Sequence, residues 1–295
     1  MLNPTSLTAS TPSPLNALPR ARSAERLMWI TPGRVFYAGL LGAPGPRTQG
    51  ALAVYVALDA PLRIRLHGGG WQQADVAVVP PYVPYEVATE ARHVLNLLIE
   101  PETVDLTALP AVLQSCGAVH APEWAARVRR CHADLVAQAR AVDLQPCDFD
   151  TLFWGQALPP RVLDARIARA LARLQDQPSS PVTAQACAAH AHLSFSRFLH
   201  LFKQEVGAPF RSVRTWKRAR SVLHHVNSAQ PLVHVALDIG YPDSTHFSHS
   251  IRQTFGLKPR DIFAGSRKLR IIGGPPLTPT PTPTPNPTPG RWLAA

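Results

Sequence analysis

Cysteine and histidine are the residues of this sequence best suited to metal binding or catalysis. The run Cys187-x-x-His190-x-His192 brings three potential ligands together, but no second cluster of regular spacing accompanies it. The four cysteines form no CxxC pair, which argues against a structural zinc site and a disulfide framework. Gly-x-Ser-x-Gly, paired carboxylates and nucleotide-binding loops are also absent from the sequence. We therefore predict no metal, no cofactor and no catalytic residue.

Hydrogen-bonding side chains at helical spacing offer a second kind of chemistry, the recognition of an extended partner. They lie in two copies of one pattern, because Ala188 and Phe198 recur as Ala236 and Phe247, at offsets of 48 and 49 residues. Each copy predicts a short helix, a tight turn and a second helix with a buried aromatic face. The difference of one residue falls in the turn, where a change of length is tolerated.

The second copy shows how the side chains are positioned. It predicts helices over 232–239 and 244–255, with Gly240 suited to end the first and Asp243 to cap the second. In the first copy Ser194 is the expected cap. Aromatic and aliphatic residues four apart face the core, so the opposite side of each second helix faces solvent. The outward side chains are Ser196, Leu199, His200 and Lys203 in the first copy and Ser244, Thr245, His249, Arg252 and Gln253 in the second.

A linking helix is predicted over 209–227. At about 1.5 Å per residue it spans about 28 Å, close to the roughly 34 Å of one turn of DNA. It would hold two outward-facing helices on one side of a duplex. Its basic side chains are suited to phosphate contacts and comprise Arg211, Arg214, Lys217, Arg218 and Arg220.

The charge of the chain is concentrated in this same region. The formal net charge is +11, and residues 161–270 hold 17 Lys and Arg against 6 Asp and Glu, whereas the remainder is balanced. Such a local excess is expected where a protein meets a polyanion such as nucleic acid or an anionic membrane. No stretch of the sequence approaches the roughly 18 apolar residues of a spanning helix, and residues 1–24 lack the apolar core of a signal peptide. We expect a cytoplasmic protein that does not bind a membrane.

The first half has a different pattern. Short apolar runs separated by Gly and Pro between residues 28 and 100 predict the strands of a small antiparallel sandwich or barrel. An amphipathic helix is predicted over 122–142, with an apolar stripe that packs on the strands or pairs with another subunit. A small-molecule pocket inside the sandwich, near Trp71, Tyr82 and Tyr85, is a further hypothesis; these residues are equally suited to a core.

The predicted fold class is therefore α+β, with an N-terminal β-rich domain and a C-terminal all-α domain that contains two helix-turn-helix units. We divide the chain into a disordered segment (1–24), a sensing domain (25–120), a helical connection or dimerisation segment (121–159), a double helix-turn-helix domain (160–270) and a disordered tail (271–295). The tail is assigned from its composition, since Pro and Thr fill 13 of the 15 positions from 275 to 289.

Residues 161–265 resemble the DNA-binding domain of the AraC/XylS family of bacterial transcription regulators. The resemblance is carried by the runs VALDIGY (235–241), STHFS (244–248) and FGLKPRD (255–261), and by 164–171 and 193–198 in the first unit. The N-terminal half resembles the cupin-like sensing domains of such regulators through residues 76–85. It lacks the His-x-His pair of metal-binding cupins, because His67 stands alone before three glycines.

The resemblance implies a sequence-specific regulator that reads two consecutive major grooves of double-stranded promoter DNA. It implies base contacts from Ser196, Leu199, His200, Ser244, Thr245 and His249. Phosphate contacts are expected from Arg197, Lys203, Arg214, Lys217, Arg218 and Arg252. The family commonly has Arg at the positions of His200 and His249, and imidazole cannot make the bidentate grip of a guanidinium on guanine. Further candidate partners are RNA polymerase, a small-molecule effector and a second copy of the chain.

Two other functions remain open at this point. A cupin-like small-molecule enzyme with an accessory helical domain predicts bound metal in the purified protein. A protein-interaction adaptor predicts no salt-dependent binding to DNA.

Overall fold

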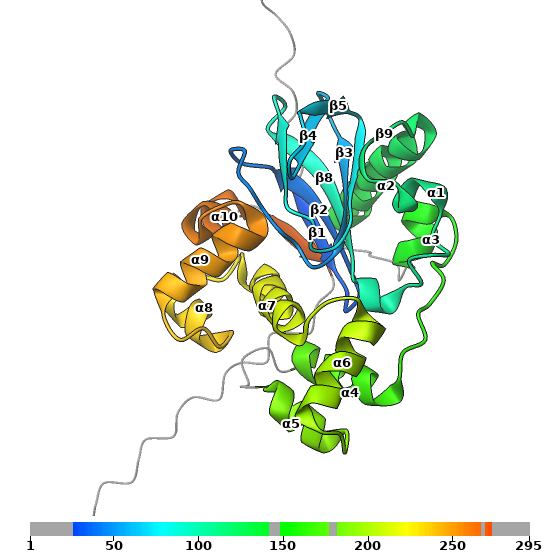
Figure 1. The fold of residues 1–295 in the computed structure, drawn as a ribbon. Helices are drawn as coiled ribbons and strands as arrows, with labels where there is room; N and C mark the ends of the chain where they lie inside the picture. The colour runs from blue at the N-terminus through cyan, green and yellow to red at the C-terminus, as the bar shows by residue number, and fades with distance from the viewer. Residues whose placement is uncertain (1–25, 142–147, 177–181, 267–268, 273–295) are drawn as a thin grey trace, which may run out of the picture.

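The computed structural model describes residues 26–141, 148–176, 182–266 and 269–272 (Figure 1). The segment predicted over 1–24 and residues 273–295 of the tail predicted over 271–295 lie outside these residues. None of the helices described has the length and hydropathy needed to cross a membrane.

The first half consists of two β-sheets. Its strands are β1 (Leu27–Ile30), β2 (Arg34–Leu40), β3 (Leu52–Ala57), β4 (Leu62–Leu66), β5 (Gln72–Ala74), β6 (Val76–Val79), β7 (Tyr85–Thr89), β8 (His93–Ile99) and β9 (Gly117–Val119). With β10 (Arg270–Ile272) from the end of the described chain, the larger sheet has the order β10-β1-β2-β8-β3-β6-β9, and the smaller one has the order β5-β4-β7. Neighbouring strands are antiparallel except β1 and β10. The predicted two-layer β-rich domain is confirmed.

Both faces of the larger sheet are covered, which explains its continuous apolar runs. All six residues of β3 are buried; Ala53 and Tyr55 pack toward the smaller sheet, and Val54 and Val56 pack toward helices. Those helices are α2 (Pro122–Ala141) and α3 (Phe149–Trp154), on the right of the sheet in Figure 1. A 3₁₀ turn, η1 (Pro101–Thr103), and the short α1 (Ala111–Gln114) precede β9.

The helix predicted over 122–142 is therefore present as α2, and its apolar stripe is already in use. Val128, Cys131 and Leu135 are buried in the same cluster as the strands. Of the two alternatives for this stripe, packing within the chain is the one observed.

The second half is helical, as predicted, up to its last strand. It contains α4 (Ala165–Asp176), α5 (Ala184–His190), α6 (Phe195–Val206), α7 (Phe210–Ser221), η2 (Val222–His225), α8 (Leu232–Asp238), α9 (Ser244–Phe255), α10 (Pro259–Ser266) and β10 (Arg270–Ile272). One hydrophobic cluster holds α4, α5 and α6 together, and a second holds α8, α9 and α10; α7 contributes Val213 to the first and Ala219 to the second. These clusters are the cores of the two helix-turn-helix units.

Two predicted boundaries are wrong. The linking helix ends at Ser221 and continues as the 3₁₀ turn η2 instead of running to 227. Its 12 residues span about 18 Å rather than 28 Å. The tail was predicted to begin at 271, but Ile271 and Ile272 pair with Met28 and Trp29 at the edge of the larger sheet. A short strand that depends on a distant partner has no local signal of its own.

The two halves share one core. Trp216 of α7, Val226 and Leu269 belong to the same apolar cluster as the strand residues between the two sheets. Gly50, just before β3, permits this approach, because a Cβ atom there would lie 2.4 Å from Cγ of Trp216. The helical half is thus packed directly against the β-rich half.

Candidate nucleic-acid interface

The two candidate recognition helices, α6 and α9, begin with well-formed caps. The side chain of Asp243 accepts hydrogen bonds from the backbone N–H groups of Thr245 and His246, both at 2.8 Å. Ser194 accepts one from Arg197 at 3.4 Å, and Gly240 has a φ of 81°. These local predictions are confirmed, and they fix where each helix starts and which side chains lie in its first turn.

The polar residues predicted to face outward do so. Ser196 and His200 on α6 are exposed, as are Ser244, Thr245 and His249 on α9. Leu199 is half-buried and packs against the core of the first unit. Behind these faces Phe198, Phe202, Phe247 and Ile251 are buried, which gives each helix one apolar and one solvent-facing side.

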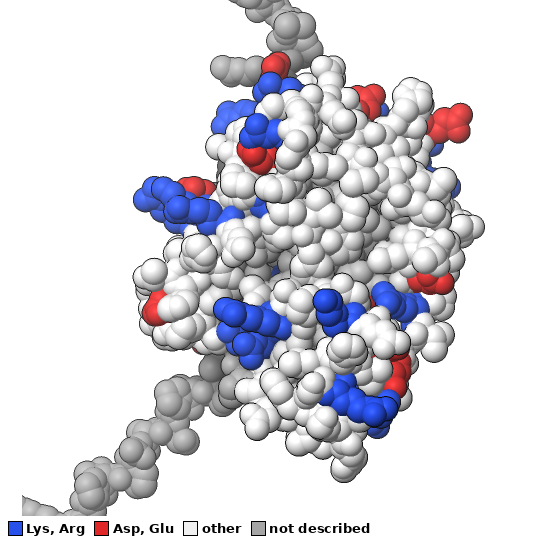
Figure 2. All heavy atoms as spheres, in the orientation of Figure 1, with Lys and Arg blue, Asp and Glu red and all other residues white. Residues whose placement is uncertain are grey.

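Basic side chains accompany these helices. Arg197, Lys203 and Arg252 are exposed. Arg214 and Arg218 are half-buried; Arg214 donates a hydrogen bond to the carbonyl of Val182 at 3.2 Å, and the guanidinium of Arg218 lies 5.5 Å from the centre of the Tyr241 ring. Figure 2 shows Lys and Arg gathered over the parts of the surface that α7 and α4 occupy in Figure 1. Five of the six predicted phosphate-contacting residues thus retain exposed surface.

Lys217 is the exception, and the prediction that it contacts phosphate is wrong in this structure. Only 4% of its surface is exposed, and its Nζ atom contacts Glu100 at 2.7 Å and also Glu102. Arg220, another basic residue expected to face solvent, is buried beside it, with Nε 2.8 Å from the carboxylate of Glu100. Both side chains of α7 point into the β-rich half instead of toward solvent.

These four residues form a compact, buried ion cluster between the halves. The Nε1–H of Trp216 also donates to Glu100, at 3.0 and 3.1 Å. Burial alone would raise the pKa of Glu100, but Lys217 and Arg220 lower it overall. For Glu102, burial and the adjacent Glu100 raise the pKa. Burial opposes the charged form of Lys217, yet the two carboxylates raise its pKa, so the lysine is cationic. The cluster joins α7 to η1 and the end of β8.

The aromatic residues proposed for a ligand pocket do not come together. Trp71 is 41% exposed at the end of the smaller sheet, with the guanidinium of Arg65 4.8 Å from its ring centre. Tyr85 is buried between the sheets and shares a hydrogen bond of 2.7 Å with Tyr55. Tyr82 packs against the first helix-turn-helix unit. Tyr82 and Tyr85 thus lie in different hydrophobic clusters and Trp71 is exposed, so the three residues do not line a common pocket.

Residues of the run 187–192 take part in core packing and in a local hydrogen bond. Cys187 is buried in the first unit, and Nδ1 of His190 lies 2.7 Å from the carbonyl of Ala186. Within the described ranges, no three His, Cys, Asp or Glu side chains are placed to share a metal ion.

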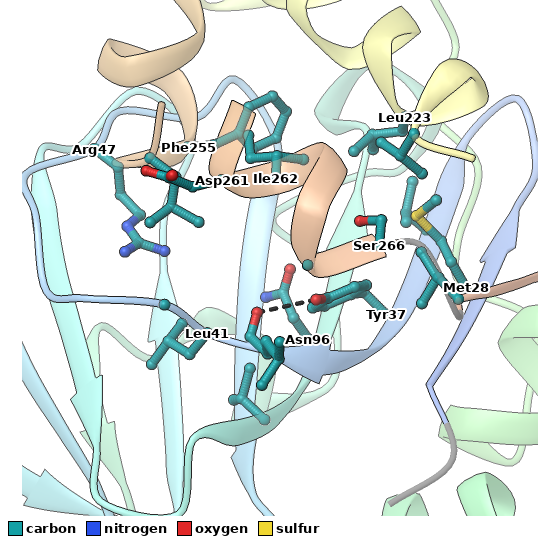
Figure 3. A pocket seen from close by; sticks show the side chains of 18 of the residues that line it. Met28, Tyr37, Leu41, Arg47, Asn96, Leu223, Phe255, Asp261, Ile262 and Ser266 are labelled. Carbon is teal, nitrogen blue, oxygen red and sulfur yellow. Dashed lines mark hydrogen bonds between the residues drawn. The ribbon is translucent and has the colours of Figure 1, made fainter. Parts of the chain in front are cut away.

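Two features of this region were missed by sequence reasoning. One is the ion cluster around Glu100. The other is a cavity of about 380 Å³ between the larger sheet and the second helix-turn-helix unit, which includes Arg47 in its lining (Figure 3). Their residues are far apart in the sequence, and the run 41–50 has only the Gly and Pro content of a loop. No local pattern marks either feature.

Known proteins resemble this chain in two different ways. Residues 187–265 match the family described as Helix-turn-helix domain. The transcriptional activator RhaS of Escherichia fergusonii is 34% identical over 105 residues, which cover 35% of this chain and 37% of RhaS. The invasion protein InvF of Salmonella typhi is 30% identical over 71 residues, 24% of this chain and 33% of InvF. The match thus spans about a third of the length of these relatives.

The likeness to a solved structure extends further along the chain. The crystal structure of ToxT from Vibrio cholerae superposes with a TM-score of 0.51 over 79% of this chain and 97% of ToxT, at 8% sequence identity. At that identity it shows a common two-domain fold and no more. The prediction that the first half is cupin-like is not confirmed by these matches.

Fold and surface together define a double helix-turn-helix protein in which a β-rich half is packed on the helical one. Residues 187–265 of its helical half are similar to helix-turn-helix domains of known transcription regulators.

Proposed function

We propose that this chain is a transcription regulator that binds specific promoter DNA and reads two consecutive major grooves with α6 and α9. The observation that supports this most directly is the solvent exposure of the first turns of both helices, each backed by its own apolar core. A helix enters the major groove with its N-terminal outward side chains against base edges. The family match of the same region and the description of RhaS as a transcriptional activator agree with this function.

The proposed contacts follow from the positions that are exposed or half-buried in the structure. Ser196, Leu199 and His200 read one half-site, and Ser244, Thr245 and His249 read the other. Arg197, Lys203, Arg214, Arg218 and Arg252 contact phosphates and supply the salt-dependent part of the affinity. Lys217 is removed from this set because it is buried.

The proposal also covers the partners of the protein and its location in the cell. The protein acts on DNA in the cytoplasm, with RNA polymerase as a partner and a second copy of the chain bound at adjacent sites. The β-rich half controls DNA binding in response to a small molecule. Its direct packing against α7 and the second helix-turn-helix unit supports such control.

Selection of bound fragments from random-sequence DNA by the purified full chain tests the function. We expect an enriched motif with two half-sites whose centres lie about 10 base pairs apart. His249→Ala and Thr245→Ala should each relax preference in one half-site by about 1–3 kcal/mol, and His200→Ala should relax it in the other.

Arg63→Gln is the matched control, because Arg63 is an exposed basic residue on β4, in the β-rich half. It should leave the motif unchanged. Absence of an enriched motif, or relaxation of the same half-site by variants on α6 and α9, would contradict the proposal.

A further inference from the structure

Phe195, the first residue of α6, is one of the few large apolar side chains that are exposed in the described ranges. Its exposed fraction is 51%, whereas the next aromatic residues of the helix, Phe198 and Phe202, are fully buried. The side chain of Ser194 caps the helix directly before it. Phe195 therefore extends from the end of α6 that enters the major groove in the proposed function.

The second copy of the repeat indicates the role of this position. The caps Ser194 and Asp243 are equivalent at an offset of 49 residues, the offset that also relates the aromatic residues behind the two helices. Phe195 then corresponds to Ser244, the first residue of α9 and one of its proposed base contacts. An apolar ring on α6 thus takes the place of a hydroxyl that is proposed to read bases on α9.

The exposed faces of α6 and α9 differ in polarity at two equivalent positions. Leu199 lies one turn after Phe195 and is half-buried, so the two side chains form a short apolar strip. On α9 the same positions hold Ser244, which is exposed, and Ser248, which is half-buried. Hydroxyls donate to or accept from the polar groups of base edges, whereas the strip makes only apolar contacts.

Thymine is the base that offers this apolar strip a partner. Its 5-methyl group is the apolar group that base pairs present in the major groove, and the other edge groups are hydrogen-bond donors and acceptors. A polar edge covered by a phenyl ring loses water without gaining a hydrogen bond, which disfavours it. Arg197 and Lys203 are exposed on the same helix, and such flanking cations suit the phosphates of a duplex. The surroundings of the strip therefore favour DNA as its partner.

We propose that Phe195, together with Leu199, reads thymine methyl groups in the half-site of α6, and that the half-site of α9 has no such dependence. This inference rests on the proposed function, because it assigns a base preference within one of the two grooves. It makes the two halves of the DNA site chemically unequal, although the two helix-turn-helix units share one pattern.

Deoxyuridine in place of thymidine tests this inference, because uracil keeps the pairing with adenine and lacks only the 5-methyl group. The DNA is the selected motif, and the half-site of α6 is the one that His200→Ala relaxes. In a fluorescence anisotropy titration of the full chain, removal of each methyl group that the strip contacts should weaken binding about threefold to fivefold. Removal of the methyl groups from the half-site of α9 should change affinity less than about twofold.

Variants of the full chain assign the effect to the side chain. Phe195→Ala should weaken binding to the thymine-containing motif and reduce the effect of uracil to less than about twofold. Phe195→Leu keeps an apolar group and should retain part of the effect. Ser244→Ala, the equivalent substitution on α9, is the matched control and should leave the effect of uracil at full size. All three variants should keep the thermal unfolding of the unaltered chain, because both side chains are exposed.

Three results would overturn the inference while leaving the proposed function intact. They are a motif without thymine in the half-site of α6, equal affinity for the thymine and uracil forms of that half-site, and an undiminished effect of uracil in Phe195→Ala. Unaltered DNA binding by Phe195→Ala with reduced transcription in a reconstituted assay would assign the side chain to a protein partner instead. A chain that enriches no motif would overturn the proposed function and this inference together.

Discussion

Lys203 and Lys217 show how far the role of a residue depends on its partners. Both lie on helices of the basic half, at positions where a lysine is suited to phosphate contact. Lys203 is exposed on α6, whereas Lys217 is buried against Glu100 and Glu102. These carboxylates are 117 and 115 residues away in the sequence, which is why helical periodicity alone gave the wrong location for Lys217.

Replacement of Lys217 by Met should destabilise the fold. It leaves two buried carboxylates with only Arg220 to compensate them, and loss of one partner from a buried ion pair costs about 3–5 kcal/mol. Urea unfolding of the purified protein measures this effect. Adding Glu102→Gln to the same chain should recover part of the loss, and an unfolding free energy within about 0.5 kcal/mol of the unaltered protein would contradict the role of the cluster.

Replacement of Lys203 by Met should weaken DNA binding and leave the stability of the fold unchanged. Stability should stay within about 0.5 kcal/mol, because the side chain is exposed. DNA affinity should fall for all sequences alike, and the slope of log affinity against log salt should decrease in magnitude by about 1. Binding measured at several salt concentrations provides the test, and an unchanged slope would remove Lys203 from the phosphate contacts.

His224 in η2 makes the stability dependent on pH. Burial, with a smaller effect of Arg220 and His225, lowers its pKa from 6.5 to about 4. Between these values the unfolded chain binds a proton that the folded chain does not, so the free energy of unfolding falls as pH decreases through this window. We expect a loss of about 1 kcal/mol between pH 7 and pH 5, after allowance for partial solvent exposure.

Thermal unfolding across this pH range measures the loss, and His224→Gln should reduce it. His234→Gln, at an exposed position on α8, is the control. Equal pH dependence in the unaltered protein and His224→Gln would show that another group is responsible.

At the scale of elements, the helices were more predictable than the contacts between them. The limits of α9 coincide with the predicted 244–255, because the Asp243 cap, the aromatic spacing and the terminal Gly256 are all local signals. The end of α7 and the strand β10 were not predicted, since both depend on packing against the β-rich half. For the candidate site, sequence located the exposed faces of α6 and α9 but neither the ion cluster nor the cavity.

Gly50 tests the contact between α7 and β3. Gly50→Ala should destabilise the protein by about 1–3 kcal/mol, because the added methyl group would overlap Trp216, which is itself buried. Chemical denaturation followed by tryptophan fluorescence measures the change. Gly70→Ala is the matched control, since a Cβ atom at Gly70 meets nothing within 4 Å. Equal stability of the two variants would show that the contact adjusts freely.

At the scale of the whole molecule, the shared core makes the two halves one unit of folding. Trp216, Val226 and Leu269 share one hydrophobic cluster with strand residues. If one half unfolded alone, the part of this cluster that belongs to the other half would be exposed to water. We expect a single calorimetric transition that coincides with the loss of helix measured by circular dichroism. Two separated transitions would show instead that the halves unfold independently and that the interface contributes little.

The parallel pairing of β10 with β1 also affects how the protein is synthesised. Leu27 leaves the ribosome far ahead of its partner Arg270, and at about 5–20 residues per second the delay is roughly 10–50 s. Throughout that interval the outer edge of β1 has unpaired backbone groups, a surface on which nascent chains can associate. Completion of the larger sheet therefore has to wait for translation of β10, and until then the growing polypeptide carries an open sheet edge.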